Sequence, residues 1–267
     1  MCFAPDALPP ELPDELRRPD VPGEALTLRS ADGAEFAAYA ARASASSDAE
    51  SGAEPNAGAG IVVLPDVRGL FTFYEKLTER FAGLGVDAIA IDYFGRTAGA
   101  EHRSADFDFM PHVQATTPAQ VAADVAAAAS WLRENVAISS LFTVGFCFGG
   151  SQSFLQAGQG LGLAGAIGFY GGLVPRNETW PDPIGAAAAT RDPILGLFGG
   201  ADRSIPQEKI DEYDTALDAA GVPHTFHVYP GAPHSFFDRT HLEHQDQCAD
   251  AWRRMHAFIF ERTSGTT

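Results

Sequence analysis

Apolar and polar positions alternate in two ways along most of this chain. Short apolar runs bounded by polar residues predict strands, and these runs occupy 61–66, 86–95, 141–146, 163–172, 193–202 and 224–230. Apolar positions at helical spacing predict helices over 74–85, 117–136, 151–158, 207–221 and 248–263. Because strand and helix alternate, we expect an α/β fold, with a mostly parallel central sheet and helices on both faces.

The beginning of the chain has a different organisation. Two strand patterns, 24–30 and 34–42, flank an ADG turn and predict an N-terminal antiparallel hairpin. Residues 1–22 are rich in proline and indicate an irregular arm. Residues 43–60 are small, acidic and low in complexity, which is typical of a surface loop. We expect a single α/β domain over 23–267 that carries this loop.

The charge of the chain is strongly negative. Its 267 residues include 35 acidic and 18 basic side chains, which give a formal net charge of −17 at pH 7. Nucleic acids and anionic membrane surfaces require clustered lysine and arginine, so we expect neither as a partner. A small anionic substrate needs only a few arginines in a pocket and is not excluded. No apolar run approaches the ~20 residues of a membrane span.

The cysteines give no disulfide framework, because there are only three of them. The N-terminal segment lacks the basic and apolar regions of a signal peptide. Both observations favour a reducing, cytoplasmic location.

The stretch LFTVGFCFGGSQSF, residues 141–154, carries the strongest chemical signal. Cys147 lies between Gly145 and Gly149, where a predicted strand ends and a helix begins. This is the G-x-S-x-G nucleophile elbow with cysteine in place of serine, a tight turn whose crowding requires neighbours without a Cβ. The following helix N-terminus favours a thiolate and an oxyanion. We therefore predict that Cys147 is a nucleophile rather than an inert buried cysteine.

A nucleophile at an elbow needs a base and an acid that orients the base, in the chain order nucleophile, acid, histidine. Asp202 follows a predicted strand in a Gly-Gly loop, and it suits the acid better than Asp182 or Asp192, which lie in an irregular segment. His234 lies in the loop after the last strand and is the best candidate base among eight histidines. The predicted triad is therefore Cys147, Asp202 and His234.

A second group of residues could bind metal. His241, His244 and Cys248 are spaced i, i+3 and i+7 and could share one face of a helix. A solvated helix start accounts for the same spacing more simply. We expect no metal site, and acyl transfer at the predicted triad requires no organic cofactor.

Three segments together resemble the dienelactone hydrolase family of α/β-hydrolases: GFCFGG around Cys147, FGGADRSIP around Asp202 and PGAPHSFFDR around His234. The segments VVLPDVRGL and AIDYFGR, upstream of them, extend the resemblance. It runs from about residue 24 to the end of the chain, with the low-complexity loop as an apparent insertion. The resemblance implies the α/β-hydrolase fold and assigns the same three residues to the triad.

The resemblance also implies roles for residues around the nucleophile. The backbone N–H groups of Val67 and Phe148 would form the oxyanion hole. Asp66 matches a family glutamate that contacts the resting thiol and helps to generate the thiolate. Aspartate is one methylene shorter, and an aspartate here could instead cap the next turn.

Substrates of the best-known dienelactone hydrolases are anionic lactones held by arginines, so the resemblance implies candidate substrate-binding residues. Arg96, in DYFGR, matches one of these arginines. Arg239 follows the histidine by five residues where about four are expected, and Arg68 lies beside a predicted oxyanion donor. An arginine can hold a carboxylate with two parallel hydrogen bonds. A surface ion pair is the alternative for each of them.

Together these residues predict a hydrolase of small activated esters or lactones that works through a thioester acyl-enzyme. One alternative is a general carboxylesterase or thioesterase with the same triad. Another is a redox-sensing or binding module on the same fold, because an exposed thiolate is readily oxidised. A sensor would have no need of Asp202 and His234 in their loops, which favours the hydrolase.

Overall fold

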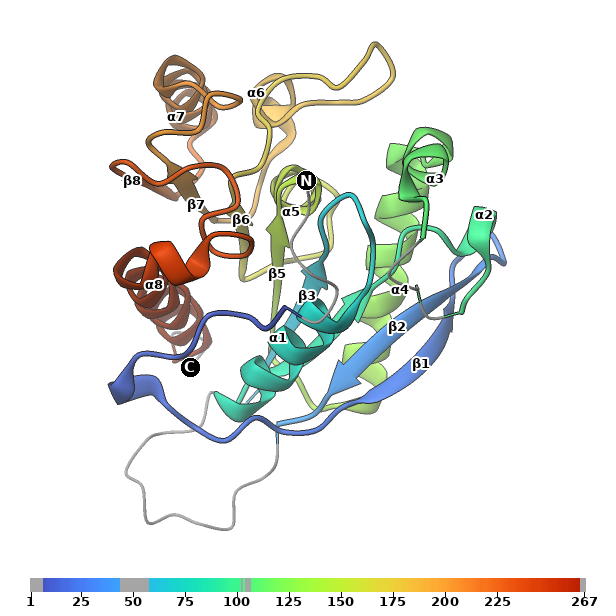
Figure 1. Ribbon diagram of the computed structural model, residues 1–267. Helices are drawn as coiled ribbons and strands as arrows, with labels where there is room; N and C mark the ends of the chain where they lie inside the picture. Colours follow the sequence, from blue (N-terminus) through green and yellow to red (C-terminus); the bar gives the residue numbers. More distant parts are fainter. Residues whose placement is uncertain (1–6, 44–57, 102, 104–106, 265–267) are drawn as a thin grey trace.

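The computed structural model describes residues 7–43, 58–101, 103 and 107–264. In this part of the chain, eight strands form one sheet in the order β1-β2-β4-β3-β5-β6-β7-β8. β1 and β2 form a hairpin, and β2 pairs antiparallel with β4. The pairs from β4 across to β8 are all parallel (Figure 1). The predicted α/β fold with an N-terminal antiparallel hairpin is therefore confirmed.

The strands are β1 Glu24–Arg29, β2 Glu35–Ala41, β3 Ala59–Leu64, β4 Asp87–Ile91, β5 Ser140–Phe146, β6 Gly165–Phe169, β7 Ile194–Gly199 and β8 His224–Tyr229. The α-helices are α1 Thr72–Gly83, α2 Gly95–Ala98, α3 Phe109–Ala115, α4 Pro118–Asn135, α5 Phe148–Gln156, α6 Pro183–Ala186, α7 Gln207–Ala220 and α8 Gln245–Ser264. Short 3-10 turns lie at Asp14–Leu16, Ala187–Ala189 and His241–Glu243.

The strand predicted over 86–95 is too long. β4 ends at Ile91, and the buried carboxylate of Asp92 then accepts a hydrogen bond from the N–H of Phe94 at 2.8 Å. This local bond turns the chain away from the sheet, and α2 begins at Gly95.

Other differences from the prediction lie at helices. The helix predicted over 151–158 begins earlier, at Phe148, directly after the nucleophile candidate. The short helices α3 and α6 were not predicted, because each is too short to show an amphipathic repeat. Most of the predicted loop at 43–60 lies outside the described residues, and β3 already begins at Ala59.

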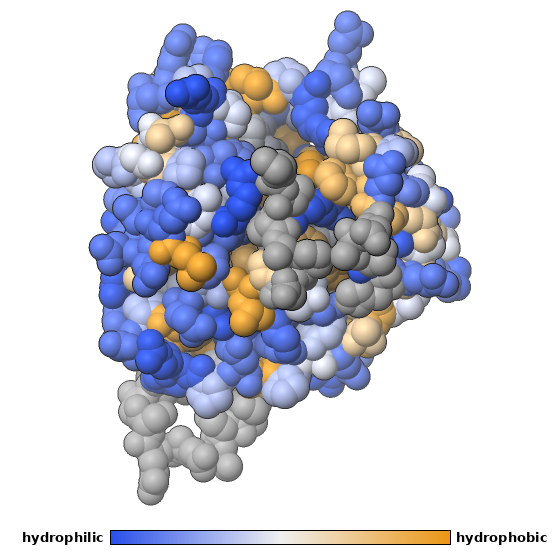
Figure 2. Space-filling model, viewed as in Figure 1, coloured by the Kyte–Doolittle hydropathy of each residue, from blue (hydrophilic) through white to orange (hydrophobic). Residues whose placement is uncertain are grey.

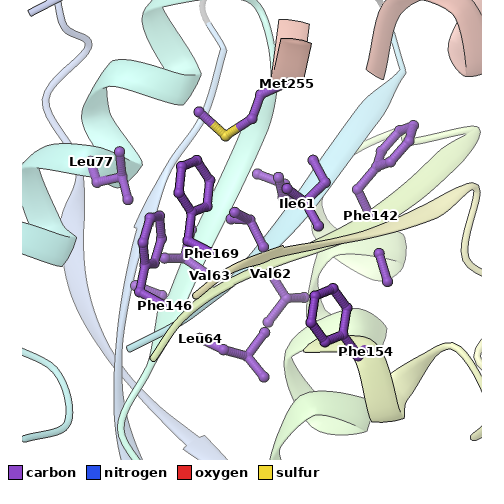
Figure 3. Close-up of a cluster of buried hydrophobic side chains, with 14 of the residues drawn as sticks. Ile61, Val62, Val63, Leu64, Leu77, Phe142, Phe146, Phe154, Phe169 and Met255 are labelled. Atoms are coloured by element: carbon purple, nitrogen blue, oxygen red, sulfur yellow. The ribbon is translucent and has the colours of Figure 1, made fainter. Parts of the chain in front are cut away.

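The core is apolar on both faces of the sheet. β3 is fully buried, and its side chains alternate between the two faces (Figure 3). Leu77 of α1 and Met255 of α8 pack against one face, and Phe154 of α5 packs against the other. A strand covered on both faces has few polar positions, which explains why β3 could be recognised as a continuous apolar run.

The N-terminal arm packs against two helices on one face of the sheet. The guanidinium of Arg80, in α1, donates hydrogen bonds to the carbonyl groups of Pro9 and Pro10. The indole of Trp252, in α8, donates to the same Pro10 oxygen at 3.1 Å. Prolines have no N–H to pair in a strand, so the arm is anchored through its carbonyl groups instead.

The face seen in Figure 2 is mostly hydrophilic, with apolar residues in small, separate groups. Among the described residues, no helix combines the length and the hydropathy needed to cross a membrane.

Candidate active site

The elbow lies between β5 and α5, at the carboxyl edge of the sheet. Cys147 has φ 54° and ψ −112°, a conformation that L-residues rarely adopt. Its N–H donates to the carbonyl of Phe169 in the neighbouring strand at 3.0 Å, which holds the turn in place. The thiol is partly exposed, as a nucleophile must be.

The glycines around the cysteine are required by close backbone contacts. A Cβ on Gly145 would lie 1.9 Å from the carbonyl oxygen of Gly149. A Cβ on Gly149 would lie 2.1 Å from the carbonyl oxygen of Leu64, at the end of β3. The elbow is thus pressed against the neighbouring strand, and the crowding expected from the sequence is present.

Backbone strain gathers at this edge of the sheet. Among the described residues, the non-glycine residues with positive φ are Cys147, Tyr170 and Ser235. Tyr170 directly follows β6, and Ser235 directly follows His234. Such conformations cost about 1–3 kcal/mol each and gather at functional sites.

Asp202 and His234 come from the ends of two paired strands, β7 and β8. Nδ1 of His234 lies 2.6 Å from Oδ2 of Asp202. The other carboxylate oxygen accepts hydrogen bonds from the N–H and the hydroxyl of Ser204, at 2.8 and 2.6 Å. Burial raises the pKa of Asp202, but the hydrogen bonds outweigh it and hold the pKa below its usual value. The carboxylate is therefore fixed and charged, as an orienting acid should be.

The imidazole of His234 also interacts with Cys147. Burial lowers the pKa of His234, but hydrogen bonds to Asp202 and Cys147, with their negative charges, outweigh burial and raise the pKa to about 10. Because Nδ1 faces Asp202, Nε2 is the ring nitrogen left for the thiol. The structure thus brings the three predicted triad residues together.

A second pair of residues supports the histidine and was not predicted. The ring of Tyr170 lies 5.0 Å from the ring of His234, and its hydroxyl donates to the carboxylate of Asp238 at 2.9 Å. Asp238 is buried, and burial, with the charge of Asp66, raises its pKa to about 7. Its place four residues after His234, in the same loop, was the only signal available from the sequence.

Asp66 is the second residue after β3, and hydrogen bonds to its neighbours hold its side chain in place. Its Oδ2 lies 2.5 Å from Nη2 of Arg68, and its Oδ1 accepts the N–H of Arg68 at 2.9 Å. The guanidinium of Arg68 also covers the ring of Phe71 at 4.2 Å. The Asp66 N–H donates to the hydroxyl of Tyr74 at 2.9 Å, which ties the turn to α1.

The predicted oxyanion donors lie on the two segments that meet at Gly149, namely the turn after β3 and the start of α5. Val67 belongs to the turn after β3, and Phe148 begins α5 directly after Cys147. In the described part of the chain, neither N–H donates a hydrogen bond to another protein group. The hydroxyl of Tyr93 donates to the carbonyl of Pro65 at 2.8 Å and fixes the turn that carries Val67.

Arg96 and Arg239 are two more of the predicted substrate-binding arginines. The guanidinium of Arg96 is held by Asp124 at 2.7 Å and by Asp32 at 2.8 Å, so its recorded contacts are with protein carboxylates. Among the described residues, these contacts join it to Asp32 and Asp124 and not to a triad residue, and its role in substrate binding stays a prediction. Arg239 lies in the exposed part of the loop after His234, and its N–H donates to Asp238.

The carboxylates of the two weaker candidate acids accept hydrogen bonds from backbone N–H groups. Asp182 caps α6 and accepts the N–H of Gly185 at 2.9 Å, and Asp192 accepts the N–H of Leu163 at 3.2 Å. These bonds orient both carboxylates toward nearby backbone groups.

The possible metal ligands do not share one helix. His241 lies in a 3-10 turn, His244 lies before α8, and Cys248 lies inside α8. Among the described residues, no group of three or more histidine, cysteine, aspartate or glutamate side chains is arranged to hold a metal.

The sequence profile of the dienelactone hydrolase family matches residues 48–263. A Salmonella typhimurium protein named "Putative carboxymethylenebutenolidase" is 33% identical over 260 residues, which are 95% of this chain and 93% of that protein. An Escherichia coli protein of the same name is 33% identical over 201 residues, 73% of this chain and 74% of that protein.

Solved structures show the same relationship. A Klebsiella pneumoniae structure titled "Putative Dienelactone Hydrolase" has a TM-score of 0.72 and 28% sequence identity, over 89% of this chain and 98% of that one. Fold, sequence and the order of the motifs therefore agree. The chain belongs to the dienelactone hydrolase family of α/β-hydrolases, enzymes that hydrolyse carboxylic esters and lactones.

Proposed function

We propose that this protein hydrolyses small activated esters or lactones by covalent catalysis. Cys147 is the nucleophile, His234 transfers protons and Asp202 orients the imidazole. The observation that carries the proposal is the position of His234. Its Nδ1 lies 2.6 Å from Asp202, and the thiol of Cys147, at a strained elbow, is near enough to raise the pKa of the imidazole. A cysteine with an inert structural role needs neither a histidine beside it nor an acid that orients the histidine.

In the first half of the reaction, the sulfur of Cys147 attacks the carbonyl carbon and forms a C–S bond. The carbonyl electron pair moves onto oxygen, and the N–H groups of Val67 and Phe148 bind the resulting oxyanion. As the tetrahedral intermediate collapses, the ester C–O bond breaks. The leaving alkoxide or enolate takes a proton from the imidazolium of His234.

In the second half, the neutral imidazole of His234 removes a proton from water, and the hydroxide attacks the thioester carbon. The C–S bond then breaks, which releases the carboxylic acid and restores the thiolate and the imidazolium. The sum is one ester and one water converted into one acid and one alcohol. A thiolate is a good leaving group, so the thioester hydrolyses readily, and activated esters are better substrates than amides.

The role of Asp66 in generating the thiolate stays a prediction. Its carboxylate is bonded to Arg68 at 2.5 Å, so part of its charge is already compensated. In our proposal this pair shapes the turn that presents the N–H of Val67, and Arg68 contributes to substrate binding only through that turn.

The test compares the hydrolysis of a dienelactone and of p-nitrophenyl acetate by wild type, Cys147→Ala and Cys248→Ala. Cys248 is a matched control, because it is a buried thiol whose hydrogen bond goes to the carbonyl of Phe236, at 3.5 Å, and not to a triad residue. We expect Cys147→Ala to lose at least ~10³-fold in kcat for both substrates. Mass spectrometry of quenched wild type should show an acyl group on Cys147.

Turnover by folded Cys147→Ala at the wild-type rate would overturn the proposal. Hydrolysis of the simple ester alone would identify a general carboxylesterase. Reversible oxidation of Cys147 without hydrolysis of either ester would favour a redox sensor.

A further inference from the structure

Two of the predicted substrate-binding arginines are paired with protein carboxylates. Arg68 is paired with Asp66, and Arg96 is paired with Asp32 and Asp124. These contacts occupy two of the arginines to which the sequence assigned substrate binding. A substrate carboxylate would therefore need another cation beside the proposed nucleophile.

Arg176 has different contacts. It lies in the segment between β6 and α6, which extends beyond the carboxyl edge of the sheet, in yellow in Figure 1. Figure 2 shows hydrophilic residues at the same place. Among the residues that the structure describes, the guanidinium of Arg176 makes no ion pair and no hydrogen bond.

Two aromatic rings position this guanidinium. Its central carbon lies 5.0 Å from the ring centre of Phe148 and 5.3 Å from that of Trp180. The two rings contact each other edge to face, with centres 5.4 Å apart. Phe148 directly follows Cys147, so the cation is held on the side chain next to the nucleophile.

Burial and the charge of Cys147 act on the guanidinium of Arg176 in opposite directions. The partial burial of Arg176 lowers its pKa, and the negative charge of Cys147 acts in the opposite direction. Both aromatic rings are buried, with 6% of their surface exposed, and so form a firm support. Arg176 itself is exposed and can be reached by a substrate.

This arrangement suits a carboxylate. Rings that contact a guanidinium near its centre leave N–H groups at its edge, and a planar carboxylate can accept two of these in parallel. Displacing water from around the guanidinium strengthens the ion pair. We propose that Arg176 binds a carboxylate of the substrate, so that the β6–α6 segment selects anionic esters or lactones. This assignment rests on the proposed function and names the substrate class of that same site.

The experiment uses two esters that differ in charge, p-nitrophenyl acetate and mono-p-nitrophenyl succinate. Arg176→Met should lower kcat/KM for the succinate ester about tenfold to a hundredfold, mainly through KM, because a charge-assisted hydrogen bond is lost. Its kcat/KM for the acetate ester should stay within about twofold. Arg29→Gln is the matched control, because it removes an exposed arginine that is paired with Glu35. It should leave both reactions unchanged.

An unchanged ratio of the two kcat/KM values in Arg176→Met would overturn the assignment. An equal loss for both esters would also overturn it, since Arg176 would then act on the nucleophile. A separate measurement does not depend on turnover: calorimetric titration of succinate into Cys147→Ala, with and without Arg176→Met. A weakening of at least tenfold supports the assignment and an unchanged Kd refutes it, even if wild type hydrolyses neither ester and the proposed function fails.

Discussion

Replacing Gly149 by alanine tests whether the elbow and the turn after β3 work as one unit. The new Cβ would lie 2.1 Å from the carbonyl oxygen of Leu64 and 2.4 Å from that of Pro65. Both are backbone atoms, which cannot rotate away as the end of a side chain can. Val67 and Phe148, the proposed oxyanion donors, lie on the two sides of this contact.

The size of the effect follows from the geometry. Ordinary contact begins at 3.4 Å, so the 2.1 Å distance must grow by about 1.3 Å. A misplacement of about 1 Å at a reacting centre can cost ~10²-fold in rate. Crowding of this kind also costs roughly 1–3 kcal/mol of stability, which corresponds to a fall in Tm of roughly 2–12 °C.

The assay measures kcat for p-nitrophenyl acetate together with Tm, for wild type, Gly149→Ala and Gly172→Ala. Gly172 is the control, because a Cβ there would meet only the hydroxyl of Ser151, at an ordinary 3.5 Å. We expect Gly149→Ala to lose about 10²-fold in kcat while its circular dichroism stays native, and Gly172→Ala to retain activity. Equal kcat and Tm for the two variants would refute the reasoning.

Two further predictions concern titrating groups. Asp202→Asn removes the charged partner of His234, so the pKa of the imidazole, about 10 in wild type, should fall when followed by NMR of the ring protons. Because that pKa is raised on folding, the stability it contributes is complete below about pH 6.5 and is lost as pH rises through about 10. Wild type should therefore lose more stability over this range than Asp202→Asn, and identical unfolding curves at each pH would contradict the ion-pair geometry. Asp238 is the opposite case: its buried carboxyl has a pKa raised to about 7, so it contributes a loss of stability as pH rises from about 4 to about 7. Asp238→Asn should remove this contribution, up to roughly 4 kcal/mol in chemical unfolding, and an unchanged slope with pH would show that the carboxyl is not buried as described.

Short sequence patterns predicted much of the fold and the three residues of the proposed triad. Apolar runs identified β3 and β5, and Thr117 identified the start of α4, where its side chain and Gln120 form a capping box. Glycines around Cys147 marked the elbow, because their necessity arises from crowding within a few residues. Chain order then placed an acid and a histidine in loops after successive strands.

Tertiary structure decided which charges meet. Arg96 pairs with Asp32 across 64 residues of sequence and with Asp124 across 28. The sequence alone could not indicate these partners, because sheet order decides which distant segments become neighbours. The bond from Tyr170 to Asp238 spans 68 residues and was missed for the same reason.

Cys147 and Arg176 show why the sequence predicts some features of the site and the tertiary structure alone decides others. Steric demands of a turn act between neighbouring residues, so the sequence around Cys147 determines the elbow by itself. A guanidinium is a candidate ligand only if no carboxylate reaches it, and that depends on every segment packed nearby. The sequence therefore determined where the proposed nucleophile lies, and only the tertiary structure decided which arginine lies open beside it.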